Sequence, residues 1–201
     1  QVYHSSVLGN EAETVKEVEY GSIDMARVSI ALLTSYNQEL LALQMPYLYK
    51  DEAHMWRVLN SGLGDKYLES MEEKGIEGLC WYGAGARNFY TSSREIRSPA
   101  DLKDMRIRVQ ESSFMMDVIG TMGAIPVDMP YEDVREALKN GGIDGAENNF
   151  PSYASAGHYH EAPYMIMDEH VRIPEMVIMN RHVLEQLSQK DQDTIRQAAY
   201  E

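Results

Sequence analysis

Two patterns of hydrophobic positions alternate along the chain. In some stretches apolar residues recur every three or four positions, which predicts amphipathic helices, and in others they form short runs, which predict strands. Several helical stretches end at a glycine, which adopts the left-handed capping conformation at low cost. The patterns predict helices near residues 10–20, 51–74 (with a break near Ser61-Gly62), 112–122 and 131–140, and strands near 23–29, 76–82, 105–109, 143–147 and 176–179.

Strands and helices that alternate at these lengths are typical of an α/β fold with largely parallel sheets. Gly83-Ala84-Gly85 directly follows a predicted strand and is the best candidate for a crossing between two lobes. Small ligands usually bind in a cleft at the carboxyl ends of the strands of such a protein. The pattern therefore favours a small-molecule site between α/β lobes.

The composition of the chain argues against some classes of binding partner. Among 201 residues, 18 are Lys or Arg and 32 are Asp or Glu, which gives a formal net charge of −14. Nucleic acids and anionic membranes attract concentrated positive charge, so we expect neither as a partner. No apolar run reaches the length of about 18 residues that a membrane helix needs, so we expect no membrane insertion. Cys80, the single cysteine, excludes an internal disulfide, and its apolar surroundings predict a small core residue.

Motifs for catalysis and cofactor binding are weak. Gly83-Ala84-Gly85 lacks the third glycine of a dinucleotide-binding fingerprint, since Asn88 stands in its place, and no phosphate loop or nucleophile elbow occurs. The surroundings of His158 and His160 predict helix and loop, so we interpret both as polar surface residues rather than metal ligands. For His170, near a strand end, a structural role and a ligand contact are equally consistent with the sequence. We expect no cofactor and no metal.

Three arginines are candidates to bind an anion. Arg87, Arg106 and Arg108 lie on or just after predicted strands of an acidic chain. A guanidinium offers a planar pair of donors to a carboxylate, and such a contact contributes roughly 1.5–3 kcal/mol. The alternation of Met105–Val109 predicts a half-exposed strand with Arg106 and Arg108 on one face. The alternative is that these arginines pair with the protein's own acids, and the residues alone leave both interpretations open.

An ordered set of motifs resembles a known family. The motifs, in chain order, are GAGARN (83–88), IRSPADLK (96–103), RIRV (106–109), GAIPVDMPY (123–131) and GIDGAENN (142–149). Together they resemble the extracytoplasmic solute-binding protein of TRAP transporters, the DctP-type subunit, over essentially all 201 residues.

The resemblance implies a two-lobed, type II-like periplasmic-binding-protein fold with a ligand cleft between the lobes. Such a protein closes on an organic acid in the periplasm and delivers it to the membrane subunits of a TRAP transporter, without enzymatic activity. Family members are longer, so we expect this chain to be incomplete at both ends. The implied lobes are residues 1–84 and 85–173, with 174–201 returning to the first lobe.

The resemblance also implies individual site residues. The family's central carboxylate-binding arginine matches Arg108, and its second arginine matches Arg87. A ligand-contacting asparagine matches Asn148, and Tyr131 matches an aromatic position that often lines the pocket. A ligand with many hydroxyls needs further hydrogen bonds, for which the expected partners are Asn88, Glu111, Asn149 and His170.

The stretch 147–153, with His170 and residues 172–175, resembles the branch of the family associated with sugar acids such as hexuronates. Ser29 stands where relatives that bind an amino sugar have a glutamate, which argues against sialic acid. A C4-dicarboxylate is the alternative, because a second arginine is able to hold a second carboxylate. Two other classes stay open: an α/β enzyme that acts on a sugar acid through His170 or Glu175, and the ligand-sensing domain of a receptor.

Overall fold

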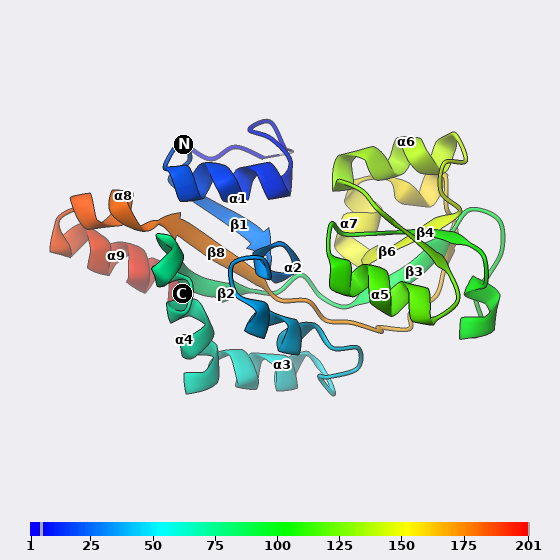
Figure 1. Ribbon diagram of the computed structural model, residues 1–201, viewed down its shortest axis with the longest axis horizontal. Coiled ribbons are helices and arrows are strands. Elements are labelled where there is room, and N and C mark those ends of the chain that lie inside the picture. The colour runs from blue at the N-terminus through cyan, green and yellow to red at the C-terminus, as the bar shows by residue number, and fades with distance from the viewer. Residues whose placement is uncertain (5, 201) are drawn as a thin grey trace. The chain divides into compact units, whose positions relative to one another are not determined.

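The chain, described by a computed structural model for residues 1–4 and 6–200, forms two compact units (Figure 1). Unit 1 comprises Gln1–Gln44, Leu48–Gly83 and Ile173–Glu201, and unit 2 comprises Met45–Tyr47 and Ala84–Arg172. Both units are α/β, and each has one sheet of its own.

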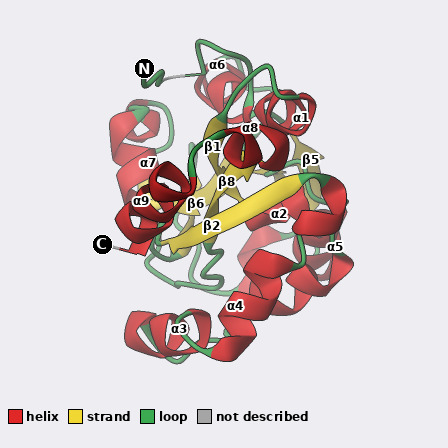
Figure 2. Cartoon of the chain, turned by 90° about the vertical axis from the view of Figure 1, so that its left-hand side faces the viewer, coloured by secondary structure: helices red, strands yellow, loops and turns green. Residues whose placement is uncertain are grey.

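The sheet of unit 1 has three strands in the order β1-β8-β2, and both neighbouring pairs are antiparallel. The prediction of largely parallel sheets is wrong here, because β8 comes from the far end of the sequence and enters between the two earlier strands. Helices α8 and α9 pack against this sheet around Leu79, Met179 and Leu184 (Figure 2). The elements of unit 1 are α1 (Glu11–Tyr20), β1 (Met25–Ser29), α2 (Ile30–Leu33), η1 (Gln38–Gln44), α3 (Glu52–Leu59), α4 (Gly62–Glu69), η2 (Glu72–Lys74), β2 (Ile76–Tyr82), β8 (Glu175–Asn180), α8 (Arg181–Gln186) and α9 (Gln189–Tyr200).

Local capping sets the ends of the helices in unit 1. Asn10 opens α1 with a capping box, and Gly21 closes it with a φ of 79°. The helix predicted over 51–74 is divided into α3, α4 and η2, because the Ser61 hydroxyl caps a new helix at the predicted break and the chain turns again before η2. Cys80 is only half-buried and lies at an irregularity of β2, so the prediction of a core residue is wrong.

The sheet of unit 2 has five strands in the order β5-β4-β6-β3-β7. β4 pairs in parallel with β5 and β6, whereas β3 pairs antiparallel with β6 and β7. The prediction of parallel strands therefore holds for the β5-β4-β6 part alone. The elements of unit 2 are β3 (Arg87–Thr91), η3 (Pro99–Leu102), β4 (Arg106–Val109), α5 (Ser113–Thr121), β5 (Ile125–Asp128), η4 (Tyr131–Asp133), α6 (Val134–Lys139), β6 (Gly145–Asn149), α7 (Phe150–Ser155), η5 (His158–His160) and β7 (Tyr164–Met165).

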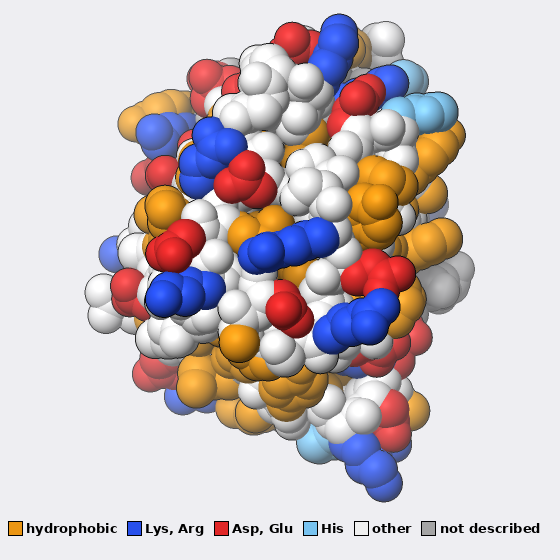
Figure 3. Space-filling view, turned by 90° about the vertical axis from the view of Figure 1, so that its right-hand side faces the viewer, with side chains coloured by type: hydrophobic (Ala, Val, Ile, Leu, Met, Phe, Trp, Pro, Cys, Tyr) orange, Lys and Arg blue, Asp and Glu red, His pale blue; other side chains and the backbone are white. Residues whose placement is uncertain are grey.

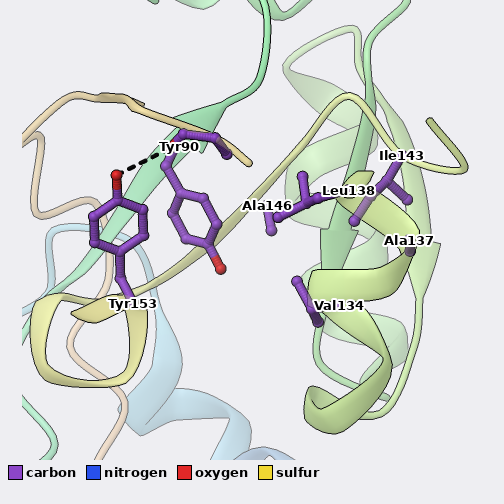
Figure 4. Close-up of a cluster of buried hydrophobic side chains, with 8 residues drawn as sticks. Tyr90, Val134, Ala137, Leu138, Ile143, Ala146 and Tyr153 are labelled. Atoms are coloured by element: carbon purple, nitrogen blue, oxygen red, sulfur yellow. Dashed lines mark hydrogen bonds between the residues drawn. The ribbon is translucent and has the colours of Figure 1, made fainter. Parts of the chain in front are cut away.

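One hydrophobic core of unit 2 joins its sheet to α6 and α7 (Figure 4). Tyr90 of β3 and Ala146 of β6 are partners in the strand register and belong to the same buried cluster as Leu138 of α6 and Tyr153 of α7. The Tyr153 hydroxyl donates to the carbonyl oxygen of Ala162 at 2.9 Å, so its polar end is satisfied inside the core. This cluster holds the position of β3 and β6, the strands that carry Arg87, Asn88, Asn148 and Asn149 of the predicted site.

We predict that Gly145→Ala lowers the free energy of unfolding by about 1–3 kcal/mol through overpacking. A Cβ at this position of β6 meets the carbonyl oxygen of Tyr90 at 2.5 Å and Cγ2 of Thr91 at 2.9 Å. Gly120→Ala in α5 is the matched control, since nothing lies within 4 Å of its Cβ, and alanine favours a helix over glycine by roughly 0.5–1 kcal/mol. Urea denaturation measures both variants, and an unchanged stability of Gly145→Ala would contradict the close approach of β3 and β6.

Candidate functional site

The sheet of unit 2 separates the predicted site residues onto two faces. Side chains alternate along strands, and residues paired in register point the same way. Because Arg108 pairs with Ala146 and Asn88 with Asn148, Arg108, Asn88 and Asn148 share one face. Because Arg87 pairs with Asn149, both lie on the other face. The two arginines that the sequence places in one site therefore start from opposite sides of the sheet.

Arg108 is buried, with 3% of its surface exposed, in β4, which lies between β5 and β6 in the sheet. Its Nε and Nη2 donate to the carbonyl oxygen of Met129 at 2.8 and 2.6 Å. The prediction of a half-exposed strand is wrong, because β4 is paired on both sides and β4 is buried from Ile107 to Val109. The Met129 carbonyl holds one edge of the guanidinium and so orients the whole planar group.

Arg106, two residues earlier, has a different partner. Its Nη2 donates to Oδ1 of Asp144 at 2.7 Å and its Nε to Oδ2 at 3.1 Å. For Arg106 the structure therefore supports the alternative of a salt bridge with the protein's own acid. The Arg106 hydrogen bonds, outweighing partial burial, lower the pKa of Asp144.

The three asparagines differ in what their amides bind. The oxygen of Asn88 accepts the Glu169 N–H at 2.9 Å, and its nitrogen donates to the Ala86 carbonyl at 3.0 Å. The oxygen of Asn149 accepts the Ser152 N–H at 2.8 Å and caps α7. The oxygen of Asn148 accepts the adjacent N–H of Asn149, whereas its Nδ2 donates to no residue in the described part of the chain. Asn148 thus keeps one amide donor for a group outside the protein.

Tyr131 and Glu111 take up different places. The Tyr131 hydroxyl donates to the carbonyl oxygen of Ser152 at 2.8 Å, and its ring lies 5.6 Å from that of His158. Glu111 is exposed in the loop between β4 and α5. Whether these two side chains contact a ligand stays a prediction.

Arg87 forms a buried ion pair with Glu147, a residue to which the sequence assigned no role. Nε of Arg87 donates to Oε2 of Glu147, and Nη2 donates to Oε1 at 2.7 Å and to the main-chain oxygen at 2.9 Å. Glu147 is fully buried and Arg87 is 5% exposed. Burial by itself raises the pKa of Glu147, but the Arg87 charge and the hydrogen bonds from His170 and Arg87 outweigh it, and the pKa falls to about 2.

His170 and Asp168 extend this pair into a row of four groups. Nδ1 of His170 lies 2.8 Å from Oδ2 of Asp168, and Nε2 lies 3.6 Å from Oε2 of Glu147. The ring stacks on Phe89 at a centroid distance of 4.3 Å. Burial lowers the pKa of His170, but its two carboxylate neighbours outweigh this effect and raise it. The row Asp168–His170–Glu147–Arg87 therefore alternates negative and positive charges. A single acid within a strand of otherwise uncharged residues was the only sequence signal for it.

The interpretation of His158 as a surface residue is wrong, whereas His160 is exposed as expected. His158 is 1% exposed, and its Nδ1 lies 2.8 Å from the hydroxyl oxygen of Tyr90. Burial, together with the charges of Arg108 and Arg135, lowers the pKa of His158 to about 4. His158 is therefore a neutral core residue on the Arg108 side of the sheet at neutral pH. Within residues 1–4 and 6–200, no group of three His, Cys, Asp or Glu is placed to hold a metal ion.

Comparison with known proteins decides the family. All 201 residues match the family described as bacterial extracellular solute-binding protein, family 7, or DctP. The chain belongs to this family. The resemblance to TRAP solute-binding proteins that the ordered motifs predicted is thereby confirmed, and the family's description agrees with the predicted extracytoplasmic location. No helix in the described part of the chain is long and apolar enough to cross a membrane.

Two solved structures of TRAP periplasmic solute-binding proteins superpose closely on this chain. One, from Bradyrhizobium sp. BTAi1 in complex with α/β-D-galacturonate, is 40% identical with a TM-score of 0.96. Another, from Xanthobacter autotrophicus Py2 with bound β-D-galacturonate, is 36% identical with a TM-score of 0.97. Each match covers 100% of this chain and 67% of the other. These structures confirm the predicted α/β periplasmic-binding-protein fold class.

A curated solute-binding protein of Chromohalobacter salexigens is 33% identical over 199 residues, which make up 99% of this chain and 59% of the relative. The chain thus spans about three-fifths of the length of that relative.

We predict that Glu147→Gln in this family 7 chain lowers the free energy of unfolding by about 3–5 kcal/mol, because it leaves the buried Arg87 without its counter-charge. Glu95→Gln is the matched control, since Glu95 pairs with Arg97 at 2.8 Å on the surface and both side chains are mostly exposed. Figure 3 shows such basic and acidic side chains interspersed on one face of the molecule. Urea denaturation compares the two variants, and equal effects would contradict the importance of the buried pair.

We predict that the free energy of unfolding is highest near pH 6.5. The pKa of His170 is raised above 6.5 in the folded state, so protonated His170 stabilises the folded protein fully below pH 6.5. This stabilisation is lost as the pH rises through the pKa of the folded state. The folded protein keeps His158 neutral, with a pKa of about 4, so the free energy of unfolding falls as the pH drops from 6.5 towards 4. The pKa of Glu147 is lowered to about 2, so the stabilisation by its carboxylate is lost between pH 4.5 and 2.

The measurement is denaturant unfolding of the wild type, of His170→Gln and of the exposed control His182→Gln across this range. His170→Gln is expected to flatten the decline above pH 6.5, whereas His182→Gln retains it. If the free energy of unfolding of His170→Gln declines above pH 6.5 as steeply as that of the wild type, another group causes the decline.

Proposed function

We propose that this chain binds a sugar acid of the hexuronate type, in the periplasm, for delivery to the membrane subunits of a TRAP transporter. The observation that carries the proposal is Arg108, a buried guanidinium oriented by the Met129 carbonyl, on the same face of the sheet as the unengaged Nδ2 of Asn148. A carboxylate pairs with the guanidinium and a hydroxyl accepts from the amide. The similarity to two galacturonate complexes, at 40% and 36% identity, supports this ligand class.

The charge of the site favours one carboxylate over two. Arg87, the predicted second arginine, already pairs with the buried Glu147, so it brings no unbalanced positive charge for a second carboxylate of the ligand. A C4-dicarboxylate needs two such charges, whereas a hexuronate has one carboxylate and several neutral hydroxyls. A direct contact between Arg87 and the ligand stays a prediction.

Binding without turnover is part of the proposal. The two residues considered for catalysis already face charged partners within their own units. His170 lies between the carboxylates of Asp168 and Glu147, and Glu175 forms an ion pair with Arg27 at 3.1 Å. A general base needs a nitrogen or oxygen within hydrogen-bond reach of substrate, and these contacts give neither residue that role.

The remaining predicted site residues and lobes belong to the same proposal. Asn88 and Asn149 hold backbone segments in place around the site, while Tyr131 and Glu111 are proposed to line it. The predicted lobe boundaries at 84/85 and 173/174 lie one position from the boundaries of the compact units at 83/84 and 172/173, whereas Met45–Tyr47, predicted in the first lobe, belongs to unit 2. We propose that these units are the two lobes.

The proposed function is tested by calorimetric titration with D-galacturonate, D-glucuronate, succinate and sialic acid. A selective response to the hexuronates is expected. Binding of succinate alone would replace the sugar acid with a dicarboxylate, and no response to any of the four acids would overturn the proposal. A new product after prolonged incubation with a hexuronate would overturn the claim of binding without turnover.

We predict that Arg108→Lys weakens hexuronate binding about ten- to hundredfold, because it keeps the charge but loses the planar pair of donors. Asn148→Ala is expected to weaken binding less, by roughly 1–3 kcal/mol at most. Arg106→Lys is the matched control on the same strand, since Arg106 pairs with Asp144 instead. Calorimetry gives the three affinities. If Arg108→Lys and Arg106→Lys bind a hexuronate equally well, the carboxylate lies elsewhere.

A further inference from the structure

Gln110 holds a buried hydrogen-bond acceptor without a donor. Its side-chain oxygen Oε1 is buried and accepts no hydrogen bond from residues 1–4 or 6–200. A buried acceptor without a partner costs about 1–3 kcal/mol, so native proteins contain few of them, and each one calls for an explanation. The oxygen of Gln110 is therefore placed for a donor that the chain itself does not supply.

The position of Gln110 connects this oxygen with the proposed site. Gln110 follows directly on β4 and is the second residue after Arg108, so the alternation of the strand carries it to the Arg108 side. Its main-chain oxygen accepts the Ser112 N–H at 2.6 Å, which fixes the turn that follows. β4 is parallel to both of its neighbours, and ligands of α/β proteins bind at the carboxyl ends of parallel strands.

The oxygens of the other side-chain amides at the site already accept hydrogen bonds from the protein. The oxygens of Asn88, Asn148 and Asn149 each accept a backbone N–H, from Glu169, Asn149 and Ser152 respectively. Of these four side-chain amides, only Gln110 has an oxygen that no donor in the described part of the chain engages. A neutral oxygen is also the suitable acceptor beside a bound carboxylate, because it adds no like charge.

We propose that Gln110 is a specificity-determining residue whose Oε1 accepts a hydrogen bond from one ring hydroxyl of the ligand held by Arg108. This inference rests on the proposed function and adds to it the chemistry of one contact. Residues i and i+2 of a strand are about 6.6 Å apart, so Arg108 and Gln110 are spaced to reach the carboxylate and a hydroxyl of the same sugar ring. Asn148 supplies a donor and Gln110 an acceptor, and together they distinguish hydroxyl positions.

The test is a titration of the wild type and Gln110→Leu with D-galacturonate and with its 2-, 3- and 4-deoxy analogues. Leucine keeps most of the side-chain volume and removes the acceptor. We expect Gln110→Leu to bind galacturonate about 3- to 15-fold more weakly, as the loss of one hydrogen bond implies. One deoxy analogue should bind the wild type similarly weakly and be insensitive to the substitution.

The stability of the ligand-free protein separates this role from a structural one. Removal of a buried acceptor without a partner is expected to leave the midpoint of thermal unfolding unchanged or higher in Gln110→Leu. Gln186→Leu, on the exposed side of α8, is the control and should bind galacturonate as the wild type does.

Equal affinities of Gln110→Leu and the wild type for galacturonate, or a loss of equal size for all three deoxy analogues, would overturn the role of Gln110 while the proposed function stands. A wild type that binds no hexuronate would overturn the proposed function, and the inference about Gln110 with it.

Discussion

The buried ion pair between Arg87 and Glu147 constrains the rest of unit 2. Two charges in the interior are tolerated only when they face each other with their hydrogen bonds satisfied. That requirement fixes the register of β3 on β6 and, through His170 and Asp168, the segment that leads out of unit 2. Because the pair and its neighbours alternate in sign, no member can be removed alone without leaving an unbalanced charge among buried residues.

The two arginines on opposite faces of the sheet of unit 2 have different partners. On one face Arg87 is neutralised inside the protein, and on the other Arg108 is held by the neutral carbonyl oxygen of Met129. The proposed preference for an acid with one carboxylate follows from the pairing of Arg87 with Glu147, and the amides of Asn148 and Gln110 on the Arg108 side are suited to the hydroxyls of such an acid.

The sequence pattern predicted most helices and strands, but it did not predict contacts between residues that are far apart in the sequence. Gly21 and Gly75 end helices where the sequence indicated, because capping depends on a few neighbouring residues. The antiparallel sheet of unit 1 depends on β8, which is more than 90 residues from β2 in sequence. Arg87 and Glu147 are separated by 60 positions, and His158 meets Tyr90 across 68. A local sequence pattern does not indicate such contacts. The motifs therefore predicted the strands of the site, but they predicted neither the Arg87–Glu147 ion pair nor the burial of His158.

The most direct test of the account is a crystal structure of the protein with D-galacturonate. We expect the carboxylate of the ligand within hydrogen-bond distance of the Arg108 guanidinium, a ligand oxygen at Nδ2 of Asn148, and the Arg87–Glu147 pair intact. A ligand bound away from Arg108, with the Arg108 guanidinium contacting protein groups alone, would contradict it.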